Sequence, residues 1–226
     1  LARDVWDDPQ LAGRLEQDAV TLRERFNRDY WLEARGHYAL ALDGEKRPVD
    51  AMSSNVGHLL WSGIVPSDRA ALMATRLMSP EMFTGWGIRT MSANDAGYNP
   101  IEYHNGTVWP HDTAFAAEGM RRYGHREQAS HLALMLIQAA AAFEYRLPEV
   151  FAGFAREETG APVEYPTASR PQAWAAGAPL LALRTALGLD VVDGTLRIDP
   201  HLSQGWGRVR LDHIAVGARA AGTLLG

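Results

Sequence analysis

Hydrophobic residues recur every three or four positions in several segments of the chain, a spacing that places them on one face of a helix. Between residues 9 and 30, charged side chains separate five such positions: Leu11, Leu15, Ala19, Leu22 and Phe26. Similar patterns predict five further helices, over residues 56–63, 67–79, 110–123, 125–145 and 171–188. We expect Ser67 to cap the third helix, while Pro110, Gly124 and Gly188 suit helix ends.

Apolar and polar residues alternate in a few short stretches, which predicts strands. These stretches cover residues 36–43, 195–198 and 209–216, and we expect strands only there and in the tail after residue 191. Two long loops, at 80–110 and 147–170, interrupt the helices. Long loops on a rigid scaffold often carry a functional site. The pattern therefore predicts one all-α domain over residues 1–226, with short peripheral strands and site-building loops.

Composition narrows the class of protein. Apolar residues make up 46% of the 226 residues, and the formal net charge is -5, with no basic block that would neutralise phosphates. We therefore expect no nucleic-acid partner. The longest apolar run, over 132–143, is too short to span a bilayer, so we expect no membrane insertion. The chain has no cysteine, which excludes disulfides and fits a reducing compartment, and we expect a cytoplasmic protein.

Three loop segments combine flat aromatic rings with glycine and short polar side chains. They cover residues 83–90, 98–112 and 147–154, and the last continues to Tyr165 and to 171–174. Sugar rings need such a mixture, because their C–H faces stack on aromatic rings and their hydroxyls need polar partners. The alternative is that these are well-packed loops, with Asp112 and Thr113 at a helix start and Trp109 and Trp174 in the core.

Hydrolysis of a glycoside needs two carboxyl groups, and Glu149 is the best single candidate for one of them. It follows a helix end and a proline, among aromatic residues that could exclude water. The alternative is a surface glutamate beside a turn. A metal site at His104, His111 and Asp112 is not expected, because Gly106 and Pro110 break the segment and no further ligand is evident. We expect no metal and no cofactor.

The loop motifs resemble a known family. Tyr98-Asn99-Pro100 followed by Tyr103-His104-Asn105-Gly106-Thr107-Val108-Trp109-Pro110-His111-Asp112 is similar to the signature of bacterial amylo-α-1,6-glucosidases, or glycogen-debranching proteins. Further similar segments follow the family's order along nearly the whole chain: 47–50, 57–61, 85–90, 147–154 and 171–176. The resemblance implies an (α/α)6 toroid of the six-hairpin glycosidase type and an inverting mechanism.

The resemblance also implies roles for individual residues. Glu149 would be the general base of a hydrolase that acts on α-glucosidic bonds of glucans or oligosaccharides. We expect four residues to stack on sugar rings: Trp86, Tyr103, Trp109 and Trp174. We expect six residues to bind sugar hydroxyls: Arg89, His104, Asn105, His111, Asp112 and Gln172.

One departure from the family pattern changes what this chain is expected to do alone. The family's general acid lies in a segment of the type W-K-D-S, and this sequence has none. The chain also has about six predicted helices, half of the expected twelve. We therefore expect the C-terminal half of the barrel, completed by an N-terminal half or by another copy of the chain. The main alternative is a non-catalytic sugar-binding remnant, and a helical scaffold for protein interactions comes third.

Overall fold

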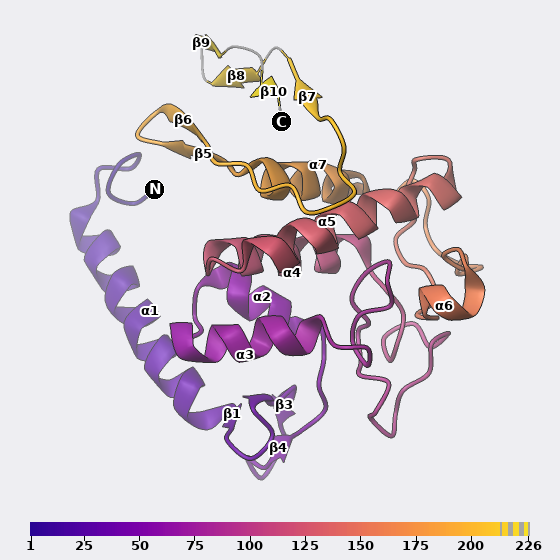
Figure 1. Cartoon of the computed structure of the whole chain (residues 1–226). Coiled ribbons are helices and arrows are strands. Elements are labelled where there is room, and N and C mark those ends of the chain that lie inside the picture. Colours follow the sequence, from indigo (N-terminus) through magenta and orange to yellow (C-terminus); the bar gives the residue numbers. More distant parts are fainter. Residues whose placement is uncertain (213, 217–218, 222–223, 226) are drawn as a thin grey trace.

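The computed structural model describes residues 1–212, 214–216, 219–221 and 224–225, and this part of the chain is mostly helical (Figure 1). The α-helices are α1 (Pro9–Asp29), α2 (Asn55–Ser62), α3 (Ser67–Leu77), α4 (Pro110–Arg122), α5 (Arg126–Ala140), α6 (Arg156–Thr159) and α7 (Ala173–Leu187). A 3-10 turn, η1 (Ala141–Phe143), extends α5. The six helices predicted from periodicity are confirmed, and α6 is a single turn inside a predicted loop.

Local chemistry explains where the helices begin and end. The Asp8 carboxylate caps α1 by accepting a hydrogen bond from the Leu11 amide at 2.8 Å. Proline occupies the first position of α4, and Gly124 and Gly188, both with positive φ, follow α4 and α7. The prediction for Ser67 was wrong by one position, because Pro66 keeps the extended cap conformation and Ser67 is the first helical residue.

The described strands form short antiparallel pairs rather than a common sheet. The pairs are β1 (Trp31–Leu32) with β2 (His37–Tyr38), β3 (Ala41–Leu42) with β4 (Pro48–Val49), β5 (Leu189–Val192) with β6 (Thr195–Ile198), β7 (Arg210–Leu211) with β10 (Leu224–Leu225), and β8 (Ile214–Val216) with β9 (Arg219–Ala221). The single strand predicted over 36–43 was wrong, because this segment divides between two hairpins. Strands β1, β4 and the start of β5 also lie outside the stretches predicted to contain them. Residue 213, inside the predicted strand 209–216, lies outside the described residues.

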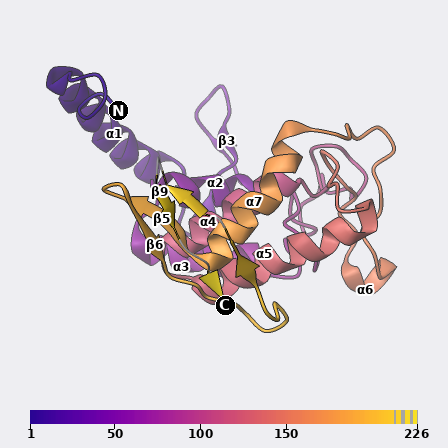
Figure 2. The ribbon, with the colours of Figure 1, turned by 90° about the horizontal axis from the view of Figure 1, so that it is seen from above.

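Helix α4 is the centre of the packing. It contacts α2 on one side and α5 and α7 on the other, and Figure 2 shows α4, α5 and α7 side by side. The α2 contact is unusually close: a methyl group added at Gly57 would lie 2.5 Å from the Cβ of Ala116, and one at Gly119 would lie 2.7 Å from the Cβ of Leu60. Glycine at these two positions therefore lets the helix backbones approach each other.

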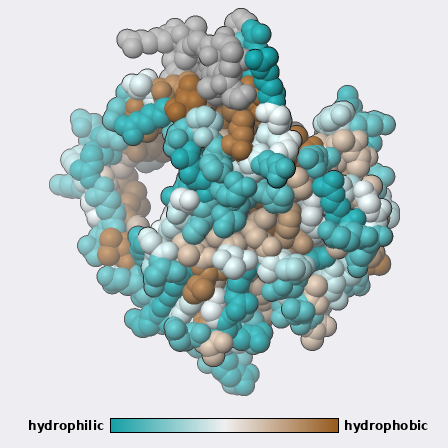
Figure 3. All heavy atoms as spheres, viewed as in Figure 1, coloured by the Kyte–Doolittle hydropathy of each residue, from teal (hydrophilic) through white to brown (hydrophobic). Residues whose placement is uncertain are grey.

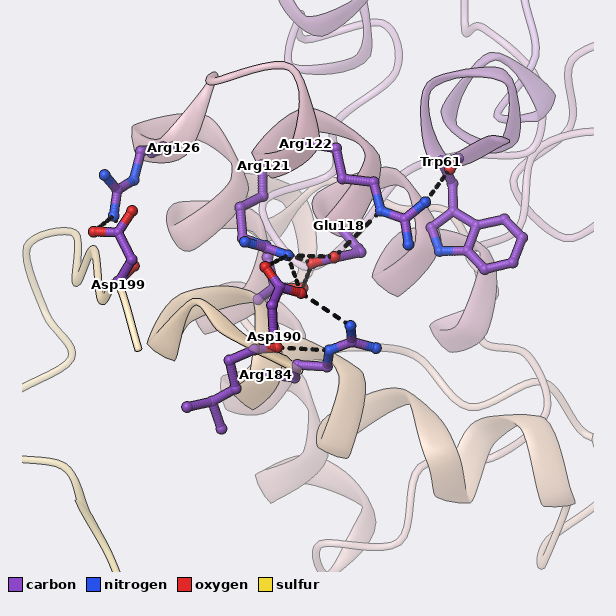
Figure 4. Close-up of polar contacts among 10 residues, drawn as sticks. Trp61, Glu118, Arg121, Arg122, Arg126, Arg184, Asp190 and Asp199 are labelled. Atoms are coloured by element: carbon purple, nitrogen blue, oxygen red, sulfur yellow. Dashed lines mark hydrogen bonds and ion pairs between the residues drawn. The ribbon is translucent and has the colours of Figure 1, made fainter. Parts of the chain in front are cut away.

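An ion-pair network centred on the buried Glu118 joins α4 to α7 and to β5 (Figure 4). The Glu118 carboxylate is fully buried and accepts hydrogen bonds from Arg121 at 2.7 and 2.8 Å and from the Thr185 hydroxyl at 2.9 Å. Arg121 also donates to Asp190, which in turn pairs with Arg184. Because every charge in the network has an opposite partner, its burial is offset by charge-assisted hydrogen bonds.

Helix α1 stands apart from the other helices, and Figure 3 shows the hollow between it and the rest of the molecule. Its C-terminal end is anchored, since Asn27 donates to the Ile64 carbonyl at 2.9 Å and Phe26 stacks on Tyr38. Farther along, Leu15 and Leu22 are 52% and 59% exposed. The predicted apolar face is therefore present, but the described residues leave much of it uncovered. None of the described helices combines the length and apolar character needed to cross a membrane.

Candidate functional site

The three loop segments singled out from the sequence are joined by backbone pairing. Isolated antiparallel bridges connect Arg89 with Val108, Val108 with Phe151, and Phe151 with Glu164. Val108 and Phe151 exchange two hydrogen bonds, at 2.9 and 3.0 Å. Segments far apart in the sequence thus form one irregular layer next to the start of α4.

Glycine makes this layer possible. A Cβ atom at Gly153 would lie 1.7 Å from the carbonyl oxygen of Gly106, and a Cβ atom at Gly106 would lie 2.4 Å from the carbonyl oxygen of Asn99. No side chain fits at either position without moving backbone. The Gly153 amide donates to Pro100 at 2.8 Å, and the Gly106 amide donates to the Thr90 hydroxyl at 2.9 Å. The loops therefore pack backbone against backbone.

A pocket of about 420 Å³ opens beside this layer, at the first turns of α2 and α4. It is lined by Leu40, Ser53, Ser54, Asn55, His58, Thr90, Met91, His104, Asn105, Trp109, His111 and Asp112. Five of the predicted sugar-binding residues are in this lining. Its size lies within the range of ordinary small-molecule sites. The lining offers an indole face, imidazoles, an amide and a carboxylate, which together suit a hydroxylated ring.

Asp112 and His58 form the polar centre of the pocket. Asp112 lies in the first turn of α4, where the helix dipole favours a negative charge, and its side chain is buried. Its Oδ1 accepts a hydrogen bond from Nε2 of His58 at 2.5 Å. This hydrogen bond raises the pKa of His58 above its ordinary value. Sequence reasoning missed His58 as a site residue, although the 57–61 segment that contains it contributed to the family resemblance.

A chain of ring contacts extends from the pocket. The Trp109 ring lies parallel to His104, with centroids 5.7 Å apart, and meets Tyr103 edge-on at 4.8 Å. The ring centroid of His111 lies 5.8 Å from that of Trp109 and 4.6 Å from that of Trp174. Burial lowers the pKa of His111, so this imidazole is neutral at pH values where His58 is still charged. Tyr103, Trp109 and Trp174, predicted as stacking platforms, therefore lie in one connected group.

Glu149 lies at the edge of this group rather than in the pocket lining. Its amide donates to the Ser169 carbonyl at 2.9 Å, and its Oε2 accepts from the Ser169 amide at 3.4 Å. Its side chain faces the Tyr103 hydroxyl, and burial together with this carboxylate raises the pKa of Tyr103. Glu149 also acts electrostatically on His111. The structure thus brings Glu149 and Trp109 to the same side of the molecule, with Tyr103 between them.

Three predicted sugar-binding residues are placed elsewhere. Trp86 is only 5% exposed, and the Arg156 guanidinium lies 4.2 Å above its ring. Arg89 is also buried and donates to the carbonyls of Gly153 at 2.8 Å and Pro80 at 2.7 Å, tying two loops together. Gln172 caps α7 by accepting from the Ala175 amide at 2.8 Å. None of the three lines the pocket, and their contact with sugar stays a prediction.

In the described part of the chain, no group of three or more histidine, aspartate or glutamate side chains is placed to hold a metal ion. The pocket and the aromatic group beside it offer a carboxylate, imidazoles and aromatic rings. These groups can bind a sugar and move a proton.

Comparison with known proteins gives a consistent result. A family model for the mannosylglycerate hydrolase MGH1-like glycoside hydrolase domain matches residues 1–175. A curated mannosylglycerate hydrolase from Rubrobacter radiotolerans is 30% identical over 139 residues, which cover 58% of this chain and 30% of that protein. The chain thus spans less than a third of the length of this relative.

Two solved structures are similar in fold. A GH63 mannosylglycerate hydrolase from Thermus thermophilus, in complex with glucose, superposes with a TM-score of 0.55 at 22% identity, over 69% of this chain and 37% of that chain. A neutral trehalase from Saccharomyces cerevisiae superposes with a TM-score of 0.60 at 17% identity, over 81% of this chain and 34% of that chain. The described helices therefore correspond to part of a six-hairpin glycosidase fold.

Proposed function

This chain belongs to the family of mannosylglycerate hydrolase MGH1-like glycoside hydrolase domains, and from this premise we propose that it is part of an enzyme that hydrolyses α-glycosidic bonds. The observation that carries the proposal is the pocket at the start of α4, where Trp109, His111 and Asp112 meet loops from distant parts of the sequence. We propose that one sugar ring lies in this pocket, with Trp109 against its C–H face and Asp112 accepting from its hydroxyls.

Glu149 is proposed as the general base. An inverting glycosidase needs a carboxylate that activates water on the face of the sugar opposite the leaving group. Glu149 is half-buried, has no cationic partner among the described residues, and lies beside Tyr103 at the rim of the aromatic group. A carboxylate in this position can accept a proton from water, because no ion pair competes for its oxygens.

The general acid is proposed to come from outside these 226 residues. Among the described residues that line the pocket, Asp112 is the one carboxylate, and it is already paired with His58. A general acid must be protonated before it donates, so a carboxylate that accepts from an imidazole does not suit the role. A second candidate function follows from the same observation: a barrel segment that binds sugar without hydrolysing it.

The substrate is proposed to be a small α-glycoside or the end of an α-glucan chain. The relatives are named for hydrolysis of mannosylglycerate and for trehalase activity, and one Thermus thermophilus structure holds D-glycerate. The comparisons support a glycoside hydrolase in general. Debranching of α-glucans, which the sequence motifs suggest, is one of the proposed activities.

The test compares Glu149→Gln with the wild type in the full-length protein. Substrates are mannosylglycerate, trehalose, and α-1,4- and α-1,6-linked glucose disaccharides. We expect the substitution to lower turnover roughly 10²- to 10⁴-fold and to leave sugar affinity nearly unchanged, because the amide retains the shape of the carboxylate. Proton NMR of the first product should show the inverted β-anomer.

Three outcomes separate the alternatives. Unchanged turnover in Glu149→Gln would remove Glu149 as the base. A product of retained α-configuration would contradict the inverting mechanism. Sugar binding without turnover of any substrate by the wild-type full-length protein would favour the sugar-binding alternative. The 226-residue chain alone should bind sugar and show little hydrolysis, and full activity from it would contradict an acid outside the chain.

A further inference from the structure

The Asp112 carboxylate presents its two oxygens to different surroundings. Oδ1 receives the hydrogen bond from His58, while Oδ2 has no donor among the described residues and belongs to a side chain that lines the pocket. A buried carboxylate with one free oxygen needs a donor from a ligand or from water. In a sugar pocket, the natural donor is a hydroxyl group.

The position of His58 is determined by packing. Gly57, the preceding residue, brings the backbone of α2 against Ala116 of α4, one turn beyond Asp112. The imidazole also packs on the Phe115 ring, with centroids 5.2 Å apart, and Phe115 packs on Trp61 at 4.7 Å. The ring is therefore supported from α4 as well as from its own helix. Such support from surrounding residues is what maintains the geometry of a binding group.

We propose that His58 is a positioning residue, which holds the Asp112 carboxylate so that its free oxygen accepts hydrogen bonds from a sugar in the pocket. This inference rests on the proposed function. Without His58, the carboxylate would rotate or attract another donor, and part of the binding geometry would be lost. His58 itself is more than a core residue, because its side chain is 39% exposed and lines the same pocket.

Other titratable groups face the same space and must be separated from His58 in any experiment. His104 and His111 line the pocket together with Asp112, and Glu149 acts on His111 from the rim. Helix α2 carries no other titratable side chain beside His58. Histidine signals must therefore be assigned individually, and substitutions that retain the hydrogen bond are more informative than pH alone.

The experiment measures glucose and mannose affinity of the full-length protein by tryptophan fluorescence and by NMR of the histidine rings. His58→Ala should weaken binding of whichever sugar the wild type binds by about 10-fold, the scale of one charge-assisted hydrogen bond. His58→Gln should restore most of this affinity, since its amide can donate to Asp112. Asp112→Asn should weaken binding as much as His58→Ala, and the double variant should lose little more.

His201→Ala is the matched control. His201 forms a similar pair with Glu127, with Nε2 and Oε2 2.8 Å apart, but this pair lies on the surface away from the pocket. Its substitution should leave sugar affinity unchanged. Thermal unfolding of each variant identifies any loss of folding, and His58→Gln provides the test if His58→Ala does not fold.

The outcomes distinguish this inference from the proposed function. If the wild type binds neither sugar, both fail together. If the wild type binds sugar and His58→Ala binds it equally well, the positioning role alone is overturned. Failure of His58→Gln to bind better than His58→Ala, with both folded, also overturns it. Partial losses of affinity in the two single variants that add up in the double variant would show that the two residues act independently, and this would also overturn the positioning role.

Discussion

Two histidines of the same pocket have opposite protonation tendencies, and the difference comes from single contacts. His58 has a carboxylate oxygen at 2.5 Å, which raises its pKa. His111, which precedes Asp112 in the chain, is surrounded by the rings of Trp109, Phe115 and Trp174, and burial lowers its pKa. The pKa values of these two imidazoles are therefore shifted in opposite directions, so that His58 stays protonated to a higher pH than His111.

The His58–Asp112 pair should make stability depend on pH with a definite sign. Because the pKa of His58 is raised in the folded protein, the pair's contribution is fully present below the unfolded value, about 6.5. The contribution is lost as pH rises through the folded pKa. The difference in free energy of unfolding between wild type and His58→Ala should therefore shrink with rising pH, as measured by urea unfolding at several pH values. A difference that grows with pH would contradict the pairing.

At the scale of elements, α4 combines structural and functional roles at its two ends. Its first turn carries His111 and Asp112 at the pocket, and its last turns carry the buried network around Glu118. The close contacts with α2 are made by Ala116 and Gly119, on either side of Glu118 in the sequence of α4. Loosening the far end should therefore reduce stability first and affect the pocket only through movement of the whole helix.

Glu118→Gln tests the network. The substitution removes a fully buried charge and leaves Arg121 with Asp190 alone, so we expect a loss of about 3 kcal/mol in the free energy of unfolding. Burial alone would raise the pKa of Glu118, but the hydrogen bonds from Arg121 and Thr185 leave it lowered. Its contribution is thus present above the unfolded pKa of about 4.3 and is lost as pH falls through the folded pKa.

Urea unfolding at neutral and acidic pH measures both effects. The matched control is Glu127→Gln, which removes an exposed carboxylate from the neighbouring helix α5 and should change stability by less than about 0.5 kcal/mol. Equal losses in the two variants would show that burial of Glu118 contributes nothing.

Sequence periodicity predicted the helices well because their apolar spacing and end residues are local signals. It missed α6, since a helix of four residues has no periodicity to detect. The division of residues 36–43 between two hairpins was also missed, because each of their strands has only two residues, too few for an alternating pattern to mark its ends. In the site, motif composition located Trp109, His111 and Asp112, whereas the contact between His58 and Asp112 spans 54 residues and depends on how α2 meets α4.

At the scale of the whole molecule, apolar surface is distributed unevenly. The core lies on both sides of α4, while α1 extends away with Leu15 and Leu22 exposed (Figures 1 and 3). Apolar faces of this kind commonly meet another surface. We propose that a further part of the protein, outside these 226 residues, covers this face.

Substitution of Leu15 and Leu22 by serine tests whether this face is exposed in the 226-residue chain and covered in the full-length protein. In the 226-residue chain, the double variant should change the free energy of unfolding by less than about 1 kcal/mol, because both side chains are already exposed. Leu60→Ala, in the core between α2 and α4, should cost roughly 3 kcal/mol. In the full-length protein, a much larger effect of the serine pair would show that the face is covered there, and the same small effect would contradict the proposed covering.

The backbone contact between Gly106 and Gly153 has a consequence for engineering. The carbonyl oxygen of Gly106 fills the space where a side chain at 153 would begin. The loop at 98–110, which contributes to the pocket lining, and the loop at 147–154 must therefore keep matching backbone courses. We expect most variants in a library that randomises the sequence of one loop alone to misfold, because the backbone of the other loop would no longer fit against it. Specificity is therefore more readily altered by transplanting residues 98–110 and 147–154 together from a homologue, with the glycine at each contact retained, than by exchanging either loop alone.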